Sequence, residues 1–364
     1  MKAKITEGPI MSVLRKCAAR SLSLIAPGVL ALGLTATSVN ALTINPEFSS
    51  SITGAADAAS IEGAINAAIK TVDSLYSNTG TVGIVFTAGA GNFVALSQTY
   101  DYSESYFEYT SLLGLNSIKN PANTTLSTAI ANIETSNKPG PGGSVLVTSA
   151  DARVALGVAS DTGHYNSSGT FVSTGGQAYD GVITLNTSIP LNFTTKPVAG
   201  EYSAIAAFEA EINEILGGGG QGSVLNQIPT GGSRVAYPNI GVLDLYRYSS
   251  PGVPSFSSGP GTYAYFSVDG GATDIIQFND NPDYELGDWA LGTCYVQSAV
   301  PCQGTEPAYT TSSPEFTMME SIGYDPVTAT PLPSTWTMLI AGFVGLGLMA
   351  SRGTKNNSVS FGAA

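Results

Sequence analysis

The sequence is poor in histidine, cysteine and charge. Its 364 residues include one histidine, His164, and three cysteines, and charged residues make up 11% of the chain. A Ser-His-Asp triad would depend on that one imidazole, and no Gly-x-Ser-x-Gly turn leads into a helix, which argues against a serine hydrolase. The many small polar residues favour strands and long loops over a helical bundle.

Basic residues are especially scarce in the central part of the chain. Between positions 42 and 330 there are seven Lys or Arg against 26 Asp or Glu, so this body has a net charge of about −19. Such a surface repels phosphate backbones, which argues against nucleic-acid partners. It suits solubility outside the cell, and it can also hold divalent cations.

The cysteines are consistent with export. Cys17 falls near the N-terminus, whereas Cys294 and Cys302 lie eight residues apart in a loop that also contains Gly292 and Gly304. Two such cysteines can close a disulfide in an oxidising compartment, and we expect this pairing. The alternative is two unrelated thiols.

The N-terminus has the three parts of a secretory signal. Residues 12–20 are basic, residues 22–37 are apolar, and Val39 and Ala41 stand at the −3 and −1 positions of a signal-peptidase site. We therefore expect residues 1–41 to be a signal peptide that signal peptidase removes after Ala41. The alternative is an uncleaved membrane anchor.

The C-terminus carries a second apolar segment. A linker at 327–335 precedes an apolar run at 336–351 and a basic tail at 352–364. The run is at the short limit of what spans a bilayer, and its aromatic and basic flanks suit a helix in the inner membrane. We expect this transmembrane segment to hold the chain at the membrane.

This tail resembles the PEP-CTERM sorting signal, which combines a Pro-rich motif, an apolar helix and a basic end. Leu332 stands where the signal has a glutamate. The matching residues are Pro331, Pro333, Ser334, Thr335 and Trp336. The resemblance implies that a membrane enzyme, exosortase, sorts the protein to the cell surface or the extracellular matrix. The alternative is a plain C-terminal anchor.

The body of the chain alternates helical and extended patterns. Apolar residues at helical spacing predict a helix at 60–76 and another at 201–216, which ends at the glycines 217–220. Strands are predicted at 81–87, 144–148 and 182–186, and short strands and loops at 240–248, 262–268 and 273–278. Further helices are predicted at 103–115, 123–134 and 313–320.

The order of these elements predicts an α+β fold. Residues 42–58 are interpreted as a polar lead-in to a body at 42–326. We expect this body to have two lobes, at about 42–217 and 218–326, with a cleft between them.

The helix at 201–216 has a pattern that is typical of a metal site. Glu211 and Glu214 share one of its faces, and like charges at this spacing repel unless they face water or a cation. The helix follows a predicted strand and ends in Leu-Gly. This is the setting of a zincin active-site helix.

Several further motifs extend this likeness along the chain. They occur at 180–186, 210–217, 241–248, 264–271, 287–289 and 321–325. Together they are similar to a family of exported, PEP-CTERM-tailed proteins of the zincin metalloprotease type, over about residues 50–326. The resemblance implies a zincin-like (metzincin-like) mixed sheet, an active-site-type helix that binds zinc, and an irregular C-terminal lobe.

The zinc-binding motif of that family is incomplete in this chain. Ala210 stands where the family has its first histidine ligand, and a methyl group cannot coordinate zinc. By position, Glu211 matches the general base and Glu214 matches the second metal ligand. His164, in a Gly/Ser-rich loop, is the one imidazole that could replace the missing ligand, although an exposed loop histidine is the simpler interpretation.

We therefore expect a non-catalytic surface protein, or one associated with an exopolysaccharide matrix in a biofilm. One alternative is an active metal-dependent peptidase with Glu211 as general base and Glu214 holding zinc with other groups. The second alternative is a purely structural surface protein.

An acidic stretch at 269–288 is a separate candidate for a cation site. Dense carboxylate oxygens in a loop suit Ca²⁺, although their spacing does not fit an EF-hand. The alternative is an ordinary solvated loop. The candidate ligands are Asp269, Asp274, Asp280, Asp283 and Asp288.

Overall fold

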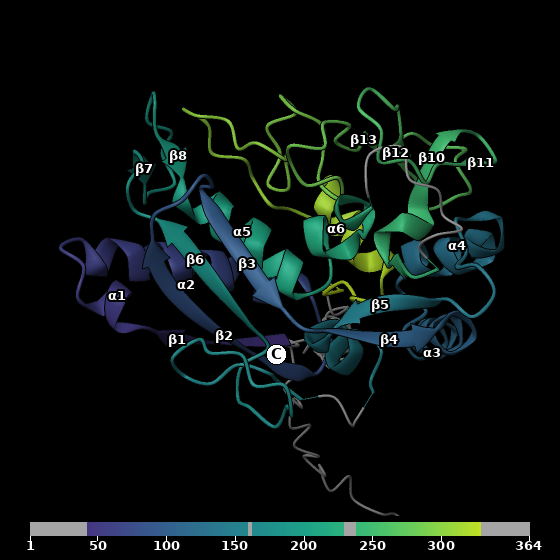
Figure 1. Ribbon diagram of the computed structural model, residues 1–364, viewed down its shortest axis with the longest axis horizontal. Coiled ribbons are helices and arrows are strands. Elements are labelled where there is room, and N and C mark those ends of the chain that lie inside the picture. Colours follow the sequence, from purple (N-terminus) through teal and green to yellow (C-terminus); the bar gives the residue numbers. More distant parts are fainter. Residues whose placement is uncertain (1–41, 159–161, 229–237, 329–364) are drawn as a thin grey trace, which may run out of the picture. The chain divides into compact units, whose positions relative to one another are not determined.

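A four-stranded mixed sheet supports the first part of the body. The computed structural model describes residues 42–158, 162–228 and 238–328 (Figure 1). In spatial order the sheet contains β1 (Leu42–Phe48), β2 (Gly80–Gly89), β6 (Gly181–Asn186) and β3 (Ala95–Thr99). The first three strands are parallel, and β3 pairs antiparallel with β6 at one edge of the sheet.

The two inner strands of this sheet are buried on both faces. Ile84 and Phe86 of β2 face the main hydrophobic core. Val85 and Val182 pack with Tyr165 on the opposite face. This explains why β2 and β6 are nearly continuous apolar runs, as in other sheets that are covered on both sides.

Two helices pack beside this sheet in the main core. α2 (Ala58–Leu75) buries Ile61, Ile65 and Ile69, whose spacing of four residues places them on one stripe. α2 packs against α5 (Ala204–Ile215), and α5 in turn contacts β3 and β6. α5 is therefore held from two sides.

A second, three-stranded sheet lies beside the first (Figure 1). β4 (Asp101–Ser105) pairs antiparallel with β5 (Ser144–Thr148), which is parallel to β9 (Ile240–Gly241). Ser105 and Asn123 cap the two helices between β4 and β5 by accepting backbone N–H bonds. The elements here are α3 (Tyr106–Lys119), α4 (Thr124–Asn132), a 3₁₀ turn η1 (Ile133–Thr135) and a π-helical turn η2 (Asp151–Ala155).

The second half of the body consists of short elements joined by long loops. Four of its strands form a sheet in the order β11, β10, β12, β13. The elements are η3 (Gly219–Gly222), η4 (Leu225–Gln227), η6 (Leu243–Tyr246), β10 (Arg247–Ser250), β11 (Val253–Pro254), β12 (Tyr265–Phe266), β13 (Ile276–Gln277) and α6 (Pro314–Ser321). The remaining short elements are α1 (Ser50–Thr53), β7 (Leu191–Asn192) and β8 (Tyr202–Ser203).

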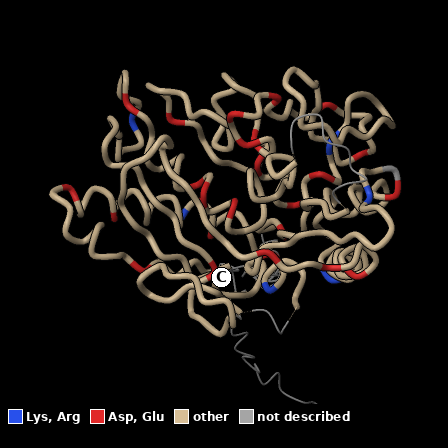
Figure 2. The backbone as a smooth tube through the Cα atoms, in the orientation of Figure 1, with Lys and Arg blue, Asp and Glu red and all other residues tan. Residues whose placement is uncertain are grey.

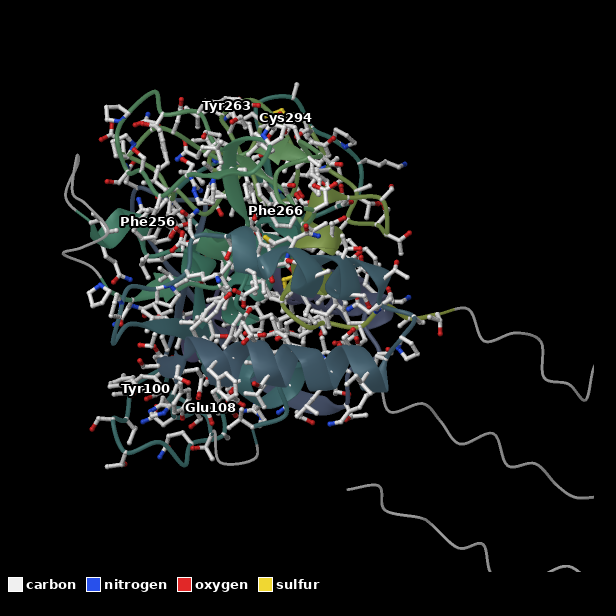
Figure 3. The ribbon with its side chains drawn as sticks, turned by 90° about the vertical axis from the view of Figure 1, so that its right-hand side faces the viewer. Tyr100, Glu108, Phe256, Tyr263, Phe266 and Cys294 are labelled. Atoms are coloured by element: carbon white, nitrogen blue, oxygen red, sulfur yellow. A yellow bond between two sulfur atoms is a disulfide. The ribbon has the colours of Figure 1, made fainter. Side chains whose placement is uncertain are left out.

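One hydrophobic core joins the two halves. It contains Phe208 of α5 together with Trp289 and Met318 from the second half. A disulfide links Cys294 to Cys302, the two cysteines that we expected to pair, in the loop where Figure 3 labels Cys294. Packing in this shared core therefore holds the irregular second half against the regular first half.

The described residues form an α+β fold, as the sequence predicts. The helices expected at 60–76 and 201–216 are present within a few residues of their predicted ends. Two expectations are wrong. The supposed polar lead-in contains β1, in which Leu42 and Ile44 are buried; Asn45 and Pro46, which are uncommon in strands, hide this pattern in the sequence. The helix expected at 103–115 begins only at Tyr106, because residues 101–105 form β4.

Several expectations fall outside the described residues. They concern the cleavage site after Ala41, the sorting motif at 331–336, the apolar run at 336–351 and the basic tail at 352–364. Within the described ranges, none of the helices is long and apolar enough to cross a membrane.

Candidate functional site

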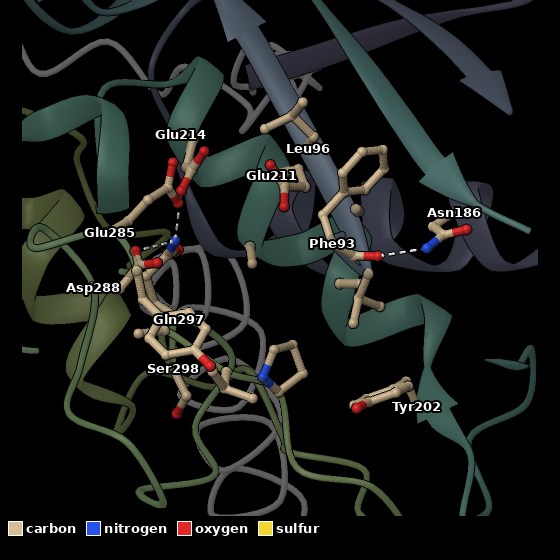
Figure 4. Close-up of a pocket in the computed structure, with 18 of the residues that line it drawn as sticks. Phe93, Leu96, Asn186, Tyr202, Glu211, Glu214, Glu285, Asp288, Gln297 and Ser298 are labelled. Carbon is tan, nitrogen blue, oxygen red and sulfur yellow. Dashed lines mark hydrogen bonds between the residues drawn. The ribbon is translucent and has the colours of Figure 1, made fainter. Parts of the chain in front are cut away.

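A pocket of about 490 Å³ opens between α5, the segment 91–96 and the loop 283–301. Figure 4 shows side chains from all three segments around it: Leu96 of β3, Glu214 of α5 and Gln297 of the loop. The pocket therefore depends on both halves of the body.

α5 presents an apolar face to the core and a polar face to this pocket. Phe208 and Ile212 are buried in the main core. Glu211 and Glu214, one turn apart, line the pocket together with Ala210. The two glutamates thus share a face, as their spacing predicts, and the methyl group of Ala210 lies on the pocket wall where the zincin motif has a histidine.

The glycines after α5 allow the loops to approach the helix end closely. Gly217 and Gly219 have φ angles of +99° and +52°, a left-handed region that favours glycine. A Cβ atom on Gly219 would lie 2.1 Å from Nε2 of Gln297, and one on Gly220 would lie 2.5 Å from Cδ of Glu285. The sequence predicted only that these glycines end the helix, whereas in the structure they also let two loop side chains approach Glu214.

Three carboxylates converge beside the end of α5. One oxygen from each of Glu214, Glu285 and Asp288 lies within 4.8 Å of the others. Oxygens that bind one cation at about 2.0 to 2.6 Å lie at most about 5 Å apart. The three groups are therefore close enough together to share one ion.

Neutral donors make hydrogen bonds to this cluster. Glu214 accepts bonds from Oγ of Ser97 at 2.6 Å and from the backbone N–H of Gly220 at 3.1 Å. Nε2 of Gln297 donates to Oε1 of Glu214 at 3.3 Å and to Oδ1 of Asp288 at 2.9 Å (Figure 4). The amide head of Gln297 thus lies between two carboxylates.

Burial makes ionisation of this cluster unfavourable. The pKa values of Glu214 and Asp288 are raised well above their usual range, first because burial removes water and then because of the nearby charge of Glu285. The same two causes raise the pKa of Glu211 to about 8, and hydrogen bonds with Glu214 and Ser97 partly offset them. Each carboxylate therefore favours either protonation or a cation beside it.

No basic side chain balances these charges in the described ranges. The ion pairs found there are Lys138–Glu134 and Arg153–Asp180, neither of which includes a residue of the pocket. Figure 2 shows how few basic positions lie among the acidic ones. The cluster therefore has hydrogen-bond donors but no positively charged partner.

His164 does not lie at the pocket. It is 4% exposed, so the interpretation as an exposed loop histidine is wrong. Its Nδ1 bonds to the carbonyl of Val172, its Nε2 bonds to the hydroxyl of Tyr102, and its ring stacks on Tyr100 at 3.8 Å. Figure 3 places Tyr100 at the opposite end of the view from Cys294. This packing holds His164 away from Glu214.

The structure separates most of the five aspartates that were candidates for calcium. Asp269 accepts bonds from Ser267 and Thr273, and Asp274 accepts one from Tyr263. Asp283 lines the pocket as an exposed residue, and only Asp288 is in the carboxylate cluster. The prediction of a single calcium loop therefore does not describe how these residues are arranged.

Sequence reasoning did not single out Glu285, Gln297 or Ser97. Glu285 lies in the acidic stretch, three residues before Asp288, but nothing in the stretch marks it as special. Ser97 lies on β3, an edge strand that was not predicted, and Gln297 is in an irregular loop. Their approach to Glu214 depends on tertiary packing, which leaves no local sequence signal.

Comparisons of the chain with protein-family models, with curated proteins and with solved structures find no match.

The donors in the pocket do not fit zinc. Protein zinc sites are built mainly from imidazole and thiolate ligands, and no His or Cys is among the residues that line this pocket. Carboxylate and amide oxygens instead suit hard cations such as Ca²⁺, Mg²⁺ or Mn²⁺. The zinc ion that the zincin resemblance implies is therefore at odds with these residues.

Proposed function

We propose that this chain is an exported protein of the bacterial envelope with a metalloprotease-like body and no zinc-dependent catalysis. It acts as a non-catalytic surface or exopolysaccharide-matrix-associated protein. The observation that carries this proposal is Ala210, which lines the pocket beside Glu211 and Glu214 where a zinc ligand would be required.

The arrangement around α5 supports a zincin-like frame for this function. The helix packs against an antiparallel edge strand, β3, of an otherwise parallel sheet. It ends in a glycine turn, and its two glutamates face a pocket. These features agree with the family motifs in the sequence, and they are compatible with a body that has no catalytic activity.

The sequence supports the proposed location. A secretory leader, a sorting-type tail and an acidic body are all expected of an exported chain that exosortase anchors or releases at the surface. The disulfide between Cys294 and Cys302 suits an oxidising compartment.

Zinc analysis combined with a peptidase assay tests the absence of catalysis. We expect the purified full-length chain to contain far less than one zinc per molecule. Peptide cleavage should be the same for wild type and Glu211→Gln. Stoichiometric zinc, with cleavage that is lost in Glu211→Gln, would instead support the active peptidase in which Glu211 is the general base.

Restoring the missing ligand tests whether the pocket derives from a zinc site. Ala210→His places an imidazole beside Glu214 on the pocket face of α5, so we expect zinc affinity to rise by at least ~100-fold. Ala210→Gln is the matched control, because it adds similar bulk without an imidazole. Equal zinc binding by the two variants would favour the purely structural surface protein.

A further inference from the structure

Gln297 has a buried oxygen that no group in the protein satisfies. Its side chain is 2% exposed, and its Oε1 atom has no hydrogen-bond partner. Buried polar atoms nearly always have a partner, so an orphaned one at a pocket points to a missing ligand, ion or water. The nitrogen of the same amide contacts both Glu214 and Asp288, so the amide group adjoins the carboxylate cluster with its nitrogen toward the carboxylates.

The two ends of the Gln297 amide are interchangeable by a half-turn about the last side-chain bond. That rotation would replace Nε2 by Oε1 at the position between Glu214 and Asp288. Next to two carboxylates an amide oxygen is repelled, unless a cation lies among them. With a cation present, the rotated oxygen becomes a fourth ligand, and Nε2 moves to the position that Oε1 leaves.

We propose that Glu214, Glu285, Asp288 and the Oε1 atom of Gln297 form a binding site for one Ca²⁺ ion. Three carboxylates and one amide oxygen are typical calcium ligands. The opening of the pocket leaves room for water at the remaining positions. The site goes beyond the proposed function, because it requires neither zinc nor catalysis.

The local structure prepares this site. Glu214 stays on a helix that is packed on two sides, and Ser97 and Gly220 hold its oxygens. Glu285 and Asp288 come from one loop, which approaches α5 only because Gly219 and Gly220 have no side chains. Ligands from a helix and a loop give the flexible geometry that Ca²⁺ tolerates and that Mg²⁺, with its strict octahedron, does not.

Calorimetric titration of the full-length chain with calcium chloride, after removal of metals with EDTA, tests the proposal. We expect one ion per chain, and binding at least ~10-fold weaker in Asp288→Asn and in Glu285→Gln. Asp280→Asn is the matched control, because it removes the same charge from the same acidic stretch at a residue that does not line the pocket, and it should bind like wild type. Wild type without binding, or ligand variants that bind as tightly as wild type, would overturn the site, and equal affinity for Mg²⁺ would overturn its assignment to Ca²⁺.

Thermal unfolding separates loss of the site from loss of the fold. Calcium should raise the melting temperature of wild type more than that of Asp288→Asn. In EDTA, wild type should melt at the same temperature as Asp288→Asn or at a lower one, since the variant lacks one of the repelling charges. If Asp288→Asn melts below wild type in EDTA, the substitution weakens the fold itself. The effect of calcium on the melting temperature is then compared between wild type and Glu285→Gln, because Glu285 is only partly buried. Zinc content does not enter this test, so the site and the proposed function can fail separately.

Discussion

Asp180 and Glu214 are both 2% exposed, yet they are surrounded by opposite kinds of neighbour. The Asp180 carboxylate accepts two bonds from the guanidinium of Arg153, at 2.8 and 2.7 Å, and one from the backbone N–H of Gly83. Glu214 accepts bonds from the neutral donors Ser97, Gly220 and Gln297, and it faces two further carboxylates.

The difference shows where the protein supplies its own countercharge. A buried carboxylate is unfavourable unless a cation accompanies it or a proton neutralises it. Asp180 has its cation within the chain, at a position that fastens η2 to β2 and β6. At Glu214 the chain provides the ligands and leaves the positive charge to come from solution, which is the basis of the proposed calcium site.

Asp151 shows a third way to stabilise a buried carboxyl group, which is to keep it protonated. It is fully buried in η2, and neither of its carboxyl oxygens has a hydrogen-bond partner. Burial raises its pKa well above the usual range. Within the described ranges, Asp151 belongs to no group of three side chains close enough to share an ion, so a neutral carboxyl group explains Asp151, whereas it does not explain three converging carboxylates.

The largest expected effect comes from removing the internal cation. Arg153→Met leaves Asp180 buried without its countercharge and should lower the free energy of unfolding by about 3–5 kcal/mol. Urea denaturation of the full-length chain measures it. Lys138→Met is the control, because the exposed Lys138–Glu134 pair should contribute only about 0–1 kcal/mol. Similar losses in the two variants would contradict the comparison.

A smaller effect is expected from the disulfide next to the pocket. Replacing Cys294 and Cys302 by serine opens a short loop, and the free energy of unfolding should fall by about 2–3 kcal/mol. Gln297 lies inside that loop, so calcium affinity should fall as well. Titration before and after reduction of wild type with dithiothreitol checks the second point. Unchanged affinity would show that the loop holds its shape without the bond.

The smallest effect is the pH dependence of stability that comes from the buried, protonated carboxyl group of Asp151. The unfolded chain releases the Asp151 proton near pH 3.8, whereas the folded chain keeps it to a much higher pH. Between these two values each pH unit lowers the free energy of unfolding of wild type by up to about 1.4 kcal/mol. Asp151→Asn lacks this dependence, so its stability relative to wild type should rise from pH 6 to pH 7. An equal difference at both pH values would show that Asp151 is ionised in the fold.

Much of the fold can be predicted from the sequence, because the helices at 58–75 and 204–215 and the inner strands have clear periodicity. β1 contains Asn45 and Pro46, which are uncommon in strands, and β3 has few β-branched residues, so neither gives that signal, although β3 supplies Ser97 to the site. Glu211 and Glu214 follow from helical spacing. Glu285 and Gln297 do not, because they reach α5 across loops whose path is set by close contacts at Gly219 and Gly220.

The same limit explains why the burial of His164 could not be predicted. As the one imidazole in the chain, His164 was the one candidate to replace the missing histidine ligand. Its position depends on stacking with Tyr100 and on bonds to Tyr102 and Val172, none of which a single sequence reveals.

The central claim is that the carboxylates around Glu214 bind a hard cation and not zinc. Its most direct test is to dialyse the full-length chain against calcium and zinc together, remove unbound metal, and count both ions per molecule by elemental analysis. The account predicts about one calcium and almost no zinc in wild type, with the calcium lost in Asp288→Asn. One zinc per chain in place of calcium would contradict it.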